Sequence, residues 1–360
     1  MSPPDYSGGS LVNLIAELET RLIGSAPSPR LHSELSNAIP EGETYVFVLF
    51  DGLGSSQLAH ANATRLAVSS VATIDACFPT TTTVSMASVA TGLPPSQHGL
   101  IAYQLWLPEV AEVVNTLKWT TLWGDHLDID HEGFLPAPAL AERLAASGVE
   151  SMTVQPGNFD GTPLSKVLYR GNRFEAAFSE EQIVDATLAL AAEPGRLVFA
   201  YVPHIDVAAH VWGQDSDDYG TALSFASDIW EKISRQLPPG VVMVGTADHG
   251  HVDVPPENQI RIPDELHEGR ILYGDSRAMF VKGDGAILAE ALPATWVDIA
   301  DLAEWWGPGP FHVGFEQRLP DGVLFADPGH LLLHRHSDTR LIGHHGGITD
   351  AELKIPLLVA

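Results

Sequence analysis

Cysteine is almost absent from this sequence, since Cys77 is the only one among 360 residues. A single cysteine cannot form a disulfide within the chain, and it cannot build a thiolate-rich zinc site. The strong metal ligands that the sequence offers are therefore the carboxylates and the 16 histidines.

Long apolar runs are also missing. Glycine, proline or charged residues interrupt every apolar segment well before about 20 residues, the length that a membrane-spanning helix needs. Residues 1–5 lack the basic, apolar and small-residue order of a secretory signal. We therefore expect a protein without a membrane segment, located in the cytoplasm.

Positive charge is scarce, with 19 lysines and arginines against 46 aspartates and glutamates and a formal net charge of −27. A field of this sign repels nucleic acid polymers and anionic lipid surfaces, so neither is an expected partner. Most of the acidic excess fits a solvated surface. A small anionic ligand would need a locally positive pocket, which bound cations can supply. The sequence does not indicate an oligomeric state.

The overall composition is that of a globular protein, and strand patterns alternate with helix patterns along the chain. Runs of β-branched and aromatic residues at 44–50, 196–202 and 241–245 predict strands that are buried on both faces. Helical patterns at 140–147 and 180–192 lie between them. This alternation predicts an α/β fold with a mostly parallel central sheet and helices on both faces.

The two ends and one internal region depart from this pattern. Residues 1–40 predict a peripheral helix, 11–22, and a linker, and residues 41–360 form the expected main domain. Within it, residues from about 251 to 330 are interpreted as a smaller inserted cap, with a strand at 278–282. The tail is expected to return to the sheet. Four aromatic residues of the cap could form a small core or stack on a substrate base: Trp296, Trp305, Trp306 and Phe311.

Acidic residues and histidines follow the predicted strands. Because ligands gather outside the carboxyl ends of parallel strands, we expect these side chains to meet. Each motif alone is equally explained by a turn, a helix cap or a surface hydrogen bond. Together they predict a site for two cations with nitrogen and oxygen ligands, which favours zinc, with manganese as the alternative. The motifs are Asp51-Gly52, Asp206-x-x-x-His210, Asp248-His249-Gly250 and the loop Gly343-His344-His345-Gly346-Gly347.

A hydroxyl-rich turn precedes a small-residue helix pattern that ends at Gly92. A threonine at a helix N-terminus lies where free N–H groups and the helix dipole favour an anionic phosphate. A metal bound to its hydroxyl would favour the nucleophilic alkoxide. The four threonines Thr80–Thr83 also supply ordinary N-caps, which is the simpler explanation without a metal.

As an ordered set, these motifs resemble the alkaline phosphatase superfamily, and most closely its nucleotide pyrophosphatase/phosphodiesterase branch. The resemblance covers residues from about 44 to 250 and the region near His345. It implies an alkaline phosphatase-like fold and a phosphoester hydrolase that uses two zinc ions and a phospho-threonine intermediate. The matching elements are Asp51-Gly, Phe78-Pro-Thr-x-Thr82, Thr91-Gly-Leu, His98-Gly, Asp206-x-x-x-His210, Asp248-His249-Gly and His345-Gly.

The resemblance also implies roles for single residues, with Thr82 as the nucleophile. Counting back from the Thr91-Gly-Leu element leaves Thr81 and Thr83 as alternatives by a slip of one residue. His345 is preferred to His344 because the family's histidine directly precedes a glycine. One zinc ion is assigned to Asp206, His210 and His345, and the other to Asp51, Thr82, Asp248 and His249.

The chain departs from the family at the phosphate-binding asparagine, whose place falls near Tyr103. The Tyr103 hydroxyl or Asn115 could take over that role, although packing and turn formation explain both residues as well. Lys118 is the nearest basic residue by sequence. Because few lysines or arginines flank the motifs, a small phosphodiester is favoured over a monoester as substrate, and a phosphonate is a third option. Folding could bring other basic side chains to the site, namely Arg173, Arg277 and Arg335.

Three further functions fit parts of the sequence. The segment from Cys77 begins like the C-x-P-x-R motif of sulfatases, but Thr81 stands in the place of the arginine. A cofactor-independent phosphoglycerate mutase would be expected to use serine and a larger inserted domain. A metal-dependent binding protein without turnover is the non-enzymatic alternative, and the intact nucleophile and ligand pattern argues against it.

Overall fold

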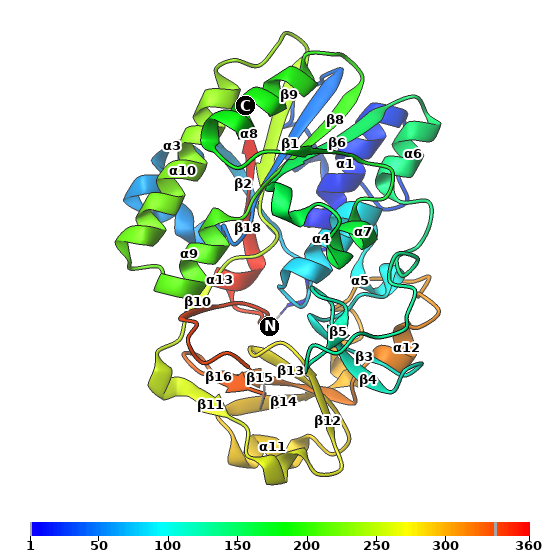
Figure 1. Cartoon of the computed structure of the whole chain (residues 1–360), viewed down its shortest axis with the longest axis vertical. Coiled ribbons are helices and arrows are strands. Elements are labelled where there is room, and N and C mark those ends of the chain that lie inside the picture. The colour runs from blue at the N-terminus through cyan, green and yellow to red at the C-terminus, as the bar shows by residue number, and fades with distance from the viewer. Residues whose placement is uncertain (1, 335–336) are drawn as a thin grey trace.

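Two seven-stranded sheets organise the chain in the computed structural model, which describes residues 2–334 and 337–360. The larger sheet has the strand order β2-β18-β9-β1-β8-β6-β7, and the smaller one β14-β15-β13-β12-β3-β4-β5. In Figure 1 the larger sheet and its helices form the upper part of the molecule, and the smaller sheet lies below them.

The centre of the larger sheet is parallel. Strand β1 (Thr44–Phe50) pairs in parallel with β8 (Arg196–Val202) on one side and with β9 (Val241–Thr246) on the other. Strands β6 (Glu150–Gln155) and β7 (Arg173–Ala176) extend it beyond β8. Every residue of β1 is buried, as expected for a strand covered on both faces. The predicted α/β class and its three central strands are confirmed.

The other edge of this sheet is antiparallel. Strand β18 (Lys354–Val359) runs antiparallel to β9 and to β2 (Ser70–Asp75). The predicted return of the C-terminal tail to the sheet is therefore confirmed, and the sheet is mixed at this edge.

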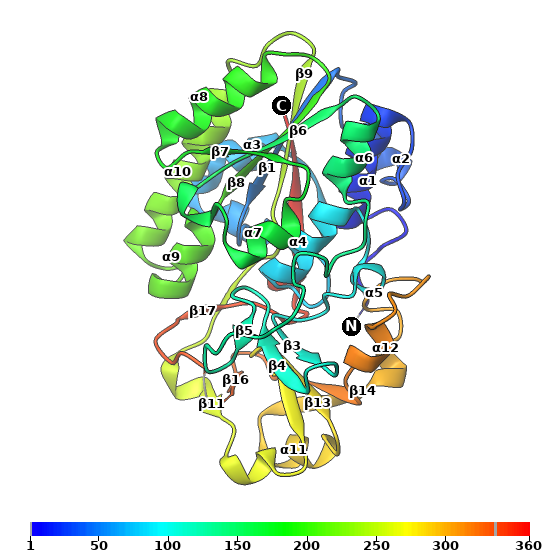
Figure 2. The ribbon, with the colours of Figure 1, turned by 45° about the vertical axis from the view of Figure 1, so that its right-hand side comes forward.

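Helices cover both faces of the larger sheet (Figures 1 and 2). One face carries α8 (Glu180–Ala191) and α10 (Asp217–Ser234), and the other carries α1 (Leu11–Ile23), α4 (Thr82–Thr91) and α6 (Leu140–Ala146). None of the described helices is long and apolar enough to cross a membrane. The other α-helices of the described chain are α2 (Ser33–Ser36), α3 (Thr64–Ser69), α5 (Pro95–His98), α7 (Pro163–Leu168), α9 (His204–Trp212), α11 (Ala286–Ala291), α12 (Phe315–Arg318) and α13 (Asp350–Leu353).

The sequence predicted that helix α1 is peripheral, but the structure shows that it is part of the packed core. It contacts α4 and α6, and all its residues from Leu11 to Glu19 are buried. Its buried acidic residues are paired, since Glu17 binds Arg30 at 2.6 Å and Glu19 binds Arg143 at 2.6 Å. The prediction was wrong because partners distant in sequence cover the polar face of the helix as well as its apolar face.

The smaller sheet takes strands from two parts of the chain. The region interpreted as a cap contributes β12 (Ile271–Gly274), β13 (Ala278–Lys282), β14 (Ala294–Asp298) and β15 (Gly322–Ala326), all antiparallel, and β13 is the strand predicted there. Gly274 of β12 pairs with Gln104, which brings a preceding segment into the sheet. That segment forms β3 (Gln104–Leu107), β4 (Glu112–Asn115) and β5 (Thr120–Thr121).

Two separate two-stranded sheets complete the strands of the described chain. One pairs β10 (Val252–Asp253) with β17 (Gly343–His344), and the other pairs β11 (Gln259–Arg261) with β16 (Leu331–Leu333).

The three tryptophans of the cap region serve packing, and two of them, Trp305 and Trp306, belong to the main hydrophobic core. Trp305 and Trp306 are buried and contact Phe78, with ring centroids 5.2 and 5.1 Å apart. Trp296 packs against a second apolar cluster of the smaller sheet. Phe311 differs, because it is 52% exposed and stacks on Phe315. The packing alternative therefore holds for the three tryptophans.

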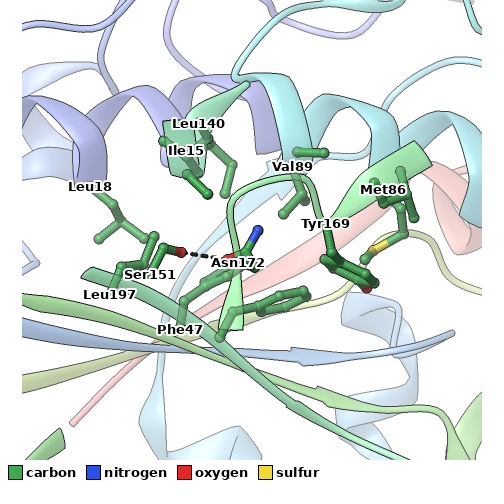
Figure 3. Close-up of a pocket in the computed structure, with 14 residues that line it drawn as sticks. Ile15, Leu18, Phe47, Met86, Val89, Leu140, Ser151, Tyr169, Asn172 and Leu197 are labelled. Atoms are coloured by element: carbon green, nitrogen blue, oxygen red, sulfur yellow. Dashed lines mark hydrogen bonds between the residues drawn. The ribbon is translucent and has the colours of Figure 1, made fainter. Parts of the chain in front are cut away.

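A small cavity lies beneath α1 and α4 (Figure 3). Its volume of about 30 Å³ has room for one or two water molecules, and its walls are mostly apolar, with Leu18, Met86 and Val89 among them. The polar pair in its wall, Ser151 and Asn172, is joined by a hydrogen bond of 2.6 Å. No predicted metal ligand lines this cavity, so it belongs to the packing of the core.

A buried ion pair links the two sheets. Arg277 lies between β12 and β13, and its Nε atom is 3.3 Å from Oε1 of Glu352 in α13, with side chains 3% and 0% exposed. Glu352 also accepts hydrogen bonds from the Gly347 N–H at 2.9 Å and from the Thr349 hydroxyl at 2.7 Å. The pair therefore holds the smaller sheet against the loop that contains His345.

Replacing Glu352 tests this link. We expect Glu352→Ala to lower the free energy of unfolding by about 3 kcal/mol or more, because it leaves the buried Arg277 unpaired. Glu132→Ala is the matched control, since Glu132 is 56% exposed in its pair with Lys166, and it should cost less than about 1 kcal/mol. Urea denaturation of both variants at equal metal load measures the difference, and equal effects would contradict the assigned role.

Candidate functional site

The predicted carboxylates and histidines meet at the carboxyl ends of the parallel strands. Asp51 follows β1, Asp248 follows β9, and Asp206 lies on α9 directly after β8. Because β8, β1 and β9 are parallel neighbours, their ends reach the same edge of the sheet. Two groups have all their ligand atoms within 4.8 Å of one another: Asp51, Asp248 and His249, and Asp206, His249, His251 and His345.

The first group surrounds Nε2 of His249. This nitrogen is 3.5 Å from Oδ1 of Asp51 and 3.4 Å from Oδ2 of Asp248. It is also 3.1 Å from the Thr82 hydroxyl oxygen. The four predicted ligands of one metal position therefore converge.

Two oxygen atoms of this group show that it suits a cation. Oδ1 of Asp51 and Oδ2 of Asp248 are buried and have no hydrogen-bond partner. The opposite oxygens are occupied, since Tyr201 donates to Oδ2 of Asp51 and the N–H groups of Gly52 and His249 donate to Oδ1 of Asp248, both at 3.1 Å. A buried carboxylate oxygen without a partner is costly unless a cation compensates it, so the residues fit a metal.

The second group surrounds Oδ1 of Asp206, which is 2.7 Å from Nε2 of His251 and 4.0 Å from Nε2 of His345. The predicted ligand His210 is not a member of this group, but its Nε2 lies 3.3 Å from the same oxygen. The structure thus brings together Asp206, His210 and His345, the three residues that the sequence assigned to one metal.

Backbone carbonyls orient the predicted histidine ligands. The Nδ1 atom of His210 is 2.7 Å from the carbonyl of Gly343, and that of His345 is 2.8 Å from the carbonyl of Thr80. Nδ1 of His249 is 3.1 Å from the Gly250 carbonyl. Because a carbonyl only accepts, Nδ1 must carry the proton, which leaves the Nε2 lone pair available for a metal.

The electrostatics of the site are dominated by burial. Burial and the nearby charge of Asp248 raise the pKa of Asp51 well above its usual range. Burial lowers the pKa of His345 well below its usual range, and the neighbouring His249 adds to this shift. Burial alone would raise the pKa of Asp206, but the adjacent His210 outweighs it. Neutral imidazoles and crowded carboxylates are the state that a bound cation favours.

The structure distinguishes the three candidate threonines. Thr82 is the first residue of α4, is partly exposed, and faces His249. Thr81 is buried near the Asp275 carboxylate, and the Thr83 hydroxyl lies 3.0 Å from that of Thr116. Both neighbours of Thr82 are thus buried and engaged in structural contacts.

Sequence reasoning missed His251. It follows the Asp248-His249-Gly250 motif by one residue, and a second histidine so close to the motif was the available signal. Two glycines border its ring: a Cβ at Gly52 would collide with Cδ2 at 2.9 Å, and one at Gly343 would lie in tight contact with Nδ1 at 3.1 Å. His251 therefore occupies a prepared space, from which Nε2 bonds the predicted ligand Asp206.

The described basic residues that the sequence offered as substrate-binding candidates do not pair with the predicted ligands. The Lys118 side chain is exposed, and its backbone N–H bonds Oδ1 of Asn115. Arg173 pairs with Glu175 at the surface, Arg277 pairs with Glu352, and Arg335 lies outside the described residues. In the described part of the chain, Thr82 and the predicted ligands form no ion pair with Lys or Arg.

Cys77 is unsuited to be a nucleophile. It is fully buried and bonds the Ser88 hydroxyl at 3.2 Å. Burial raises the pKa of its thiol to about 12, which keeps it in the unreactive protonated form. The sulfatase alternative is therefore disfavoured.

Solved structures share this fold. Murine ectonucleotide pyrophosphatase/phosphodiesterase 5 aligns with a TM-score of 0.65 and 20% identity over 87% of each chain. Phosphonoacetate hydrolase from Sinorhizobium meliloti 1021, in complex with phosphonoacetate, aligns with a TM-score of 0.65 and 16% identity over 89% of this chain and 91% of that one. No curated protein matches this chain by sequence.

The family model "Type I phosphodiesterase / nucleotide pyrophosphatase" matches residues 45–348, which include every strand-end motif and the loop of His345. This range is most of the chain and agrees with the resemblance found in the motifs. The chain belongs to the type I phosphodiesterase/nucleotide pyrophosphatase family of the alkaline phosphatase superfamily, whose members are hydrolases acting on phosphoester bonds.

Proposed function

We propose that the chain is a two-metal phosphodiesterase or nucleotide pyrophosphatase that acts through a phospho-threonine intermediate. The observation that supports this most directly is the partly exposed Thr82 hydroxyl, 3.1 Å from Nε2 of His249, a residue common to both ligand groups. A binding protein without turnover would have no need of such a hydroxyl.

Two zinc ions, or manganese as the alternative, suit the proposed ligands. Asp206, His210 and His345 would hold one ion, and Asp51, Thr82, Asp248 and His249 the other. When bound, such ions favour deprotonation of a hydroxyl or water and stabilise charge on phosphoryl oxygens.

The chain's own groups supply the nucleophile and bind the charge that develops. The Thr82 hydroxyl gives up its proton to solvent, and its oxygen forms a bond to phosphorus while the bond from phosphorus to the leaving oxygen breaks, which releases an alcohol after proton uptake or a phosphate. Water then attacks the threonine phosphate, the bond from phosphorus to the Thr82 oxygen breaks, and the phosphorylated product is released as this oxygen takes up a proton. At the N-terminus of the ten-residue helix α4, backbone N–H groups and the helix dipole favour the anionic phosphoryl group beside Thr82.

A diester is the preferred substrate class. A diester carries one negative charge at the reacting phosphorus and a monoester dianion carries two, and no Lys or Arg pairs with the described site residues. An inactive variant of the murine relative has been solved in complex with AMP, and the bacterial relative acts on phosphonoacetate by name. These two ligands define the alternatives within the same metal chemistry.

Removing the hydroxyl tests the nucleophile. With zinc restored, we expect Thr82→Ala to reduce hydrolysis of bis-p-nitrophenyl phosphate by about 1000-fold or more, since no other group can form the covalent intermediate. Its metal content should stay nearly unchanged. Cys77→Ala is the control and should remain active. The reverse pattern, with Cys77→Ala inactive and Thr82→Ala active, would support the sulfatase alternative.

Metal removal tests the cation requirement. Dialysis against a chelator should abolish turnover and lower Tm, because Asp51, Asp206 and Asp248 then lose their compensating charge. Adding zinc should restore both, and manganese is the comparison ion. Metal analysis is expected to find about two ions per chain. Full activity of a metal-free preparation would refute the two-metal proposal.

A side-by-side rate comparison tests the substrate class. We expect kcat/KM for bis-p-nitrophenyl phosphate or a nucleotide pyrophosphate to exceed that for p-nitrophenyl phosphate by about tenfold or more, since no Lys or Arg among the described residues pairs with the site to balance a second charge. Phosphonoacetate should be included as a fourth substrate. A faster monoester or phosphonate reaction would overturn the diester preference.

A further inference from the structure

Tyr103 lies near the proposed nucleophile because its main chain is joined to Thr83, the residue after Thr82. Its carbonyl oxygen accepts the Thr116 N–H at 2.9 Å, and the Thr116 hydroxyl lies 2.9 Å from this oxygen and 3.0 Å from Oγ1 of Thr83. On the other side, the buried Asp275 carboxylate lies near Thr81 and Tyr103, whose polar groups oppose the rise that burial causes in its pKa. The Thr116 bridge and this neighbouring carboxylate place the Tyr103 main chain near the turn that carries Thr82.

Asn115, the last residue of β4, is fixed in one orientation. Its Oδ1 accepts the N–H groups of Leu117 at 3.0 Å and Lys118 at 3.1 Å. A flipped amide would place the NH₂ group against these two donors, so Nδ2 must lie on the opposite side. There it donates to the Tyr103 hydroxyl oxygen at 2.9 Å.

The hydrogen of the Tyr103 hydroxyl is therefore directed away from Asn115. Among the described residues, no side-chain or backbone oxygen accepts it, and the Tyr103 side chain is partly exposed. Burial raises the pKa of Tyr103, and the nearby Asp275 adds to the shift, so the hydroxyl keeps its proton. Tyr103 thus offers a neutral O–H donor, and Thr116 joins its main chain to Thr83, the residue that follows the proposed nucleophile.

We propose that the Tyr103 hydroxyl donates a hydrogen bond to a non-bridging phosphoryl oxygen of the substrate, in the place where the family has an asparagine. Asn115 is the positioning residue that turns this O–H toward the substrate. The inference rests on the proposed function and refines it, because a neutral donor adds no positive charge to the site and so suits a singly charged diester.

Removing only the hydroxyl tests the contact. In the zinc-loaded full chain, Tyr103→Phe should lower kcat/KM for bis-p-nitrophenyl phosphate by about 10- to 100-fold and weaken binding of inorganic phosphate, with metal content unchanged. Tyr219→Phe is the matched control, because the Tyr219 hydroxyl on α10 is buried and has no partner. A Tyr103→Phe enzyme within twofold of wild type would overturn the proposal.

Reversing the polarity of Asn115 tests its positioning role. Asn115→Asp keeps the oxygen that accepts from Leu117 and Lys118, but it replaces the NH₂ donor with an acceptor that captures the tyrosine hydrogen. We expect a loss comparable to that of Tyr103→Phe, and no further loss when Asn115→Asp is added to Tyr103→Phe. If Asn115→Asp causes the same loss in the wild-type enzyme and in the Tyr103→Phe enzyme, Asn115 acts only through the paired strands β3 and β4, and the proposal is contradicted.

Phosphate binding separates failure of this inference from failure of the proposed function. If wild type with restored metal shows no turnover but binds inorganic phosphate by calorimetry, the proposed function fails. The Tyr103 contact is then still decided by whether Tyr103→Phe weakens that binding. If wild type turns over and the tyrosine variant is unchanged in rate and phosphate affinity, only the present inference fails.

Discussion

The compensation of three clustered carboxylates, of which two are buried and that of Asp206 is partly buried, is the constraint on which the site depends. Asp51, Asp206 and Asp248 reach one sheet edge because β1, β8 and β9 are parallel neighbours. Such a cluster opposes folding unless positive charge is supplied, and histidines kept neutral by burial supply little. The fold therefore suits cations at the position where the nucleophile turn begins, and binding of those cations and stability of the domain are thermodynamically linked.

The loop of His345 connects this centre to the rest of the molecule. Thr80 bonds it three times, through its carbonyl to His345 Nδ1 at 2.8 Å and through its hydroxyl to the Gly346 N–H at 3.1 Å and the Gly347 carbonyl at 2.9 Å. Asp275 packs on Gly346, where a Cβ would lie 2.5 Å from that of the aspartate. The smaller sheet therefore supports a predicted ligand and the nucleophile turn together, and it is more than a cover over the site.

The sequence predicted the parts of the site that local patterns define. Strand-end motifs identified Asp51, Asp206 and Asp248. The small-residue helix pattern predicted a threonine at a helix N-terminus, and the family resemblance selected Thr82, which is the first residue of α4. The burial of α1 and the recruitment of β3 into the smaller sheet could not be predicted, because both depend on partners far away in the chain. His251 was missed for a related reason, since the space that Gly52 and Gly343 leave for its ring exists only after folding.

The position of β18 has a consequence for the order of assembly. This strand is late in the sequence but interior in the sheet, where it separates β9 from β2. Strand β2 therefore has no partner in the sheet until residues 354–359 have left the ribosome, and the segment with His345 emerges only shortly before them. During synthesis the parallel strands can pair first, while the ligand set stays incomplete and the edge of β9 stays open to other chains.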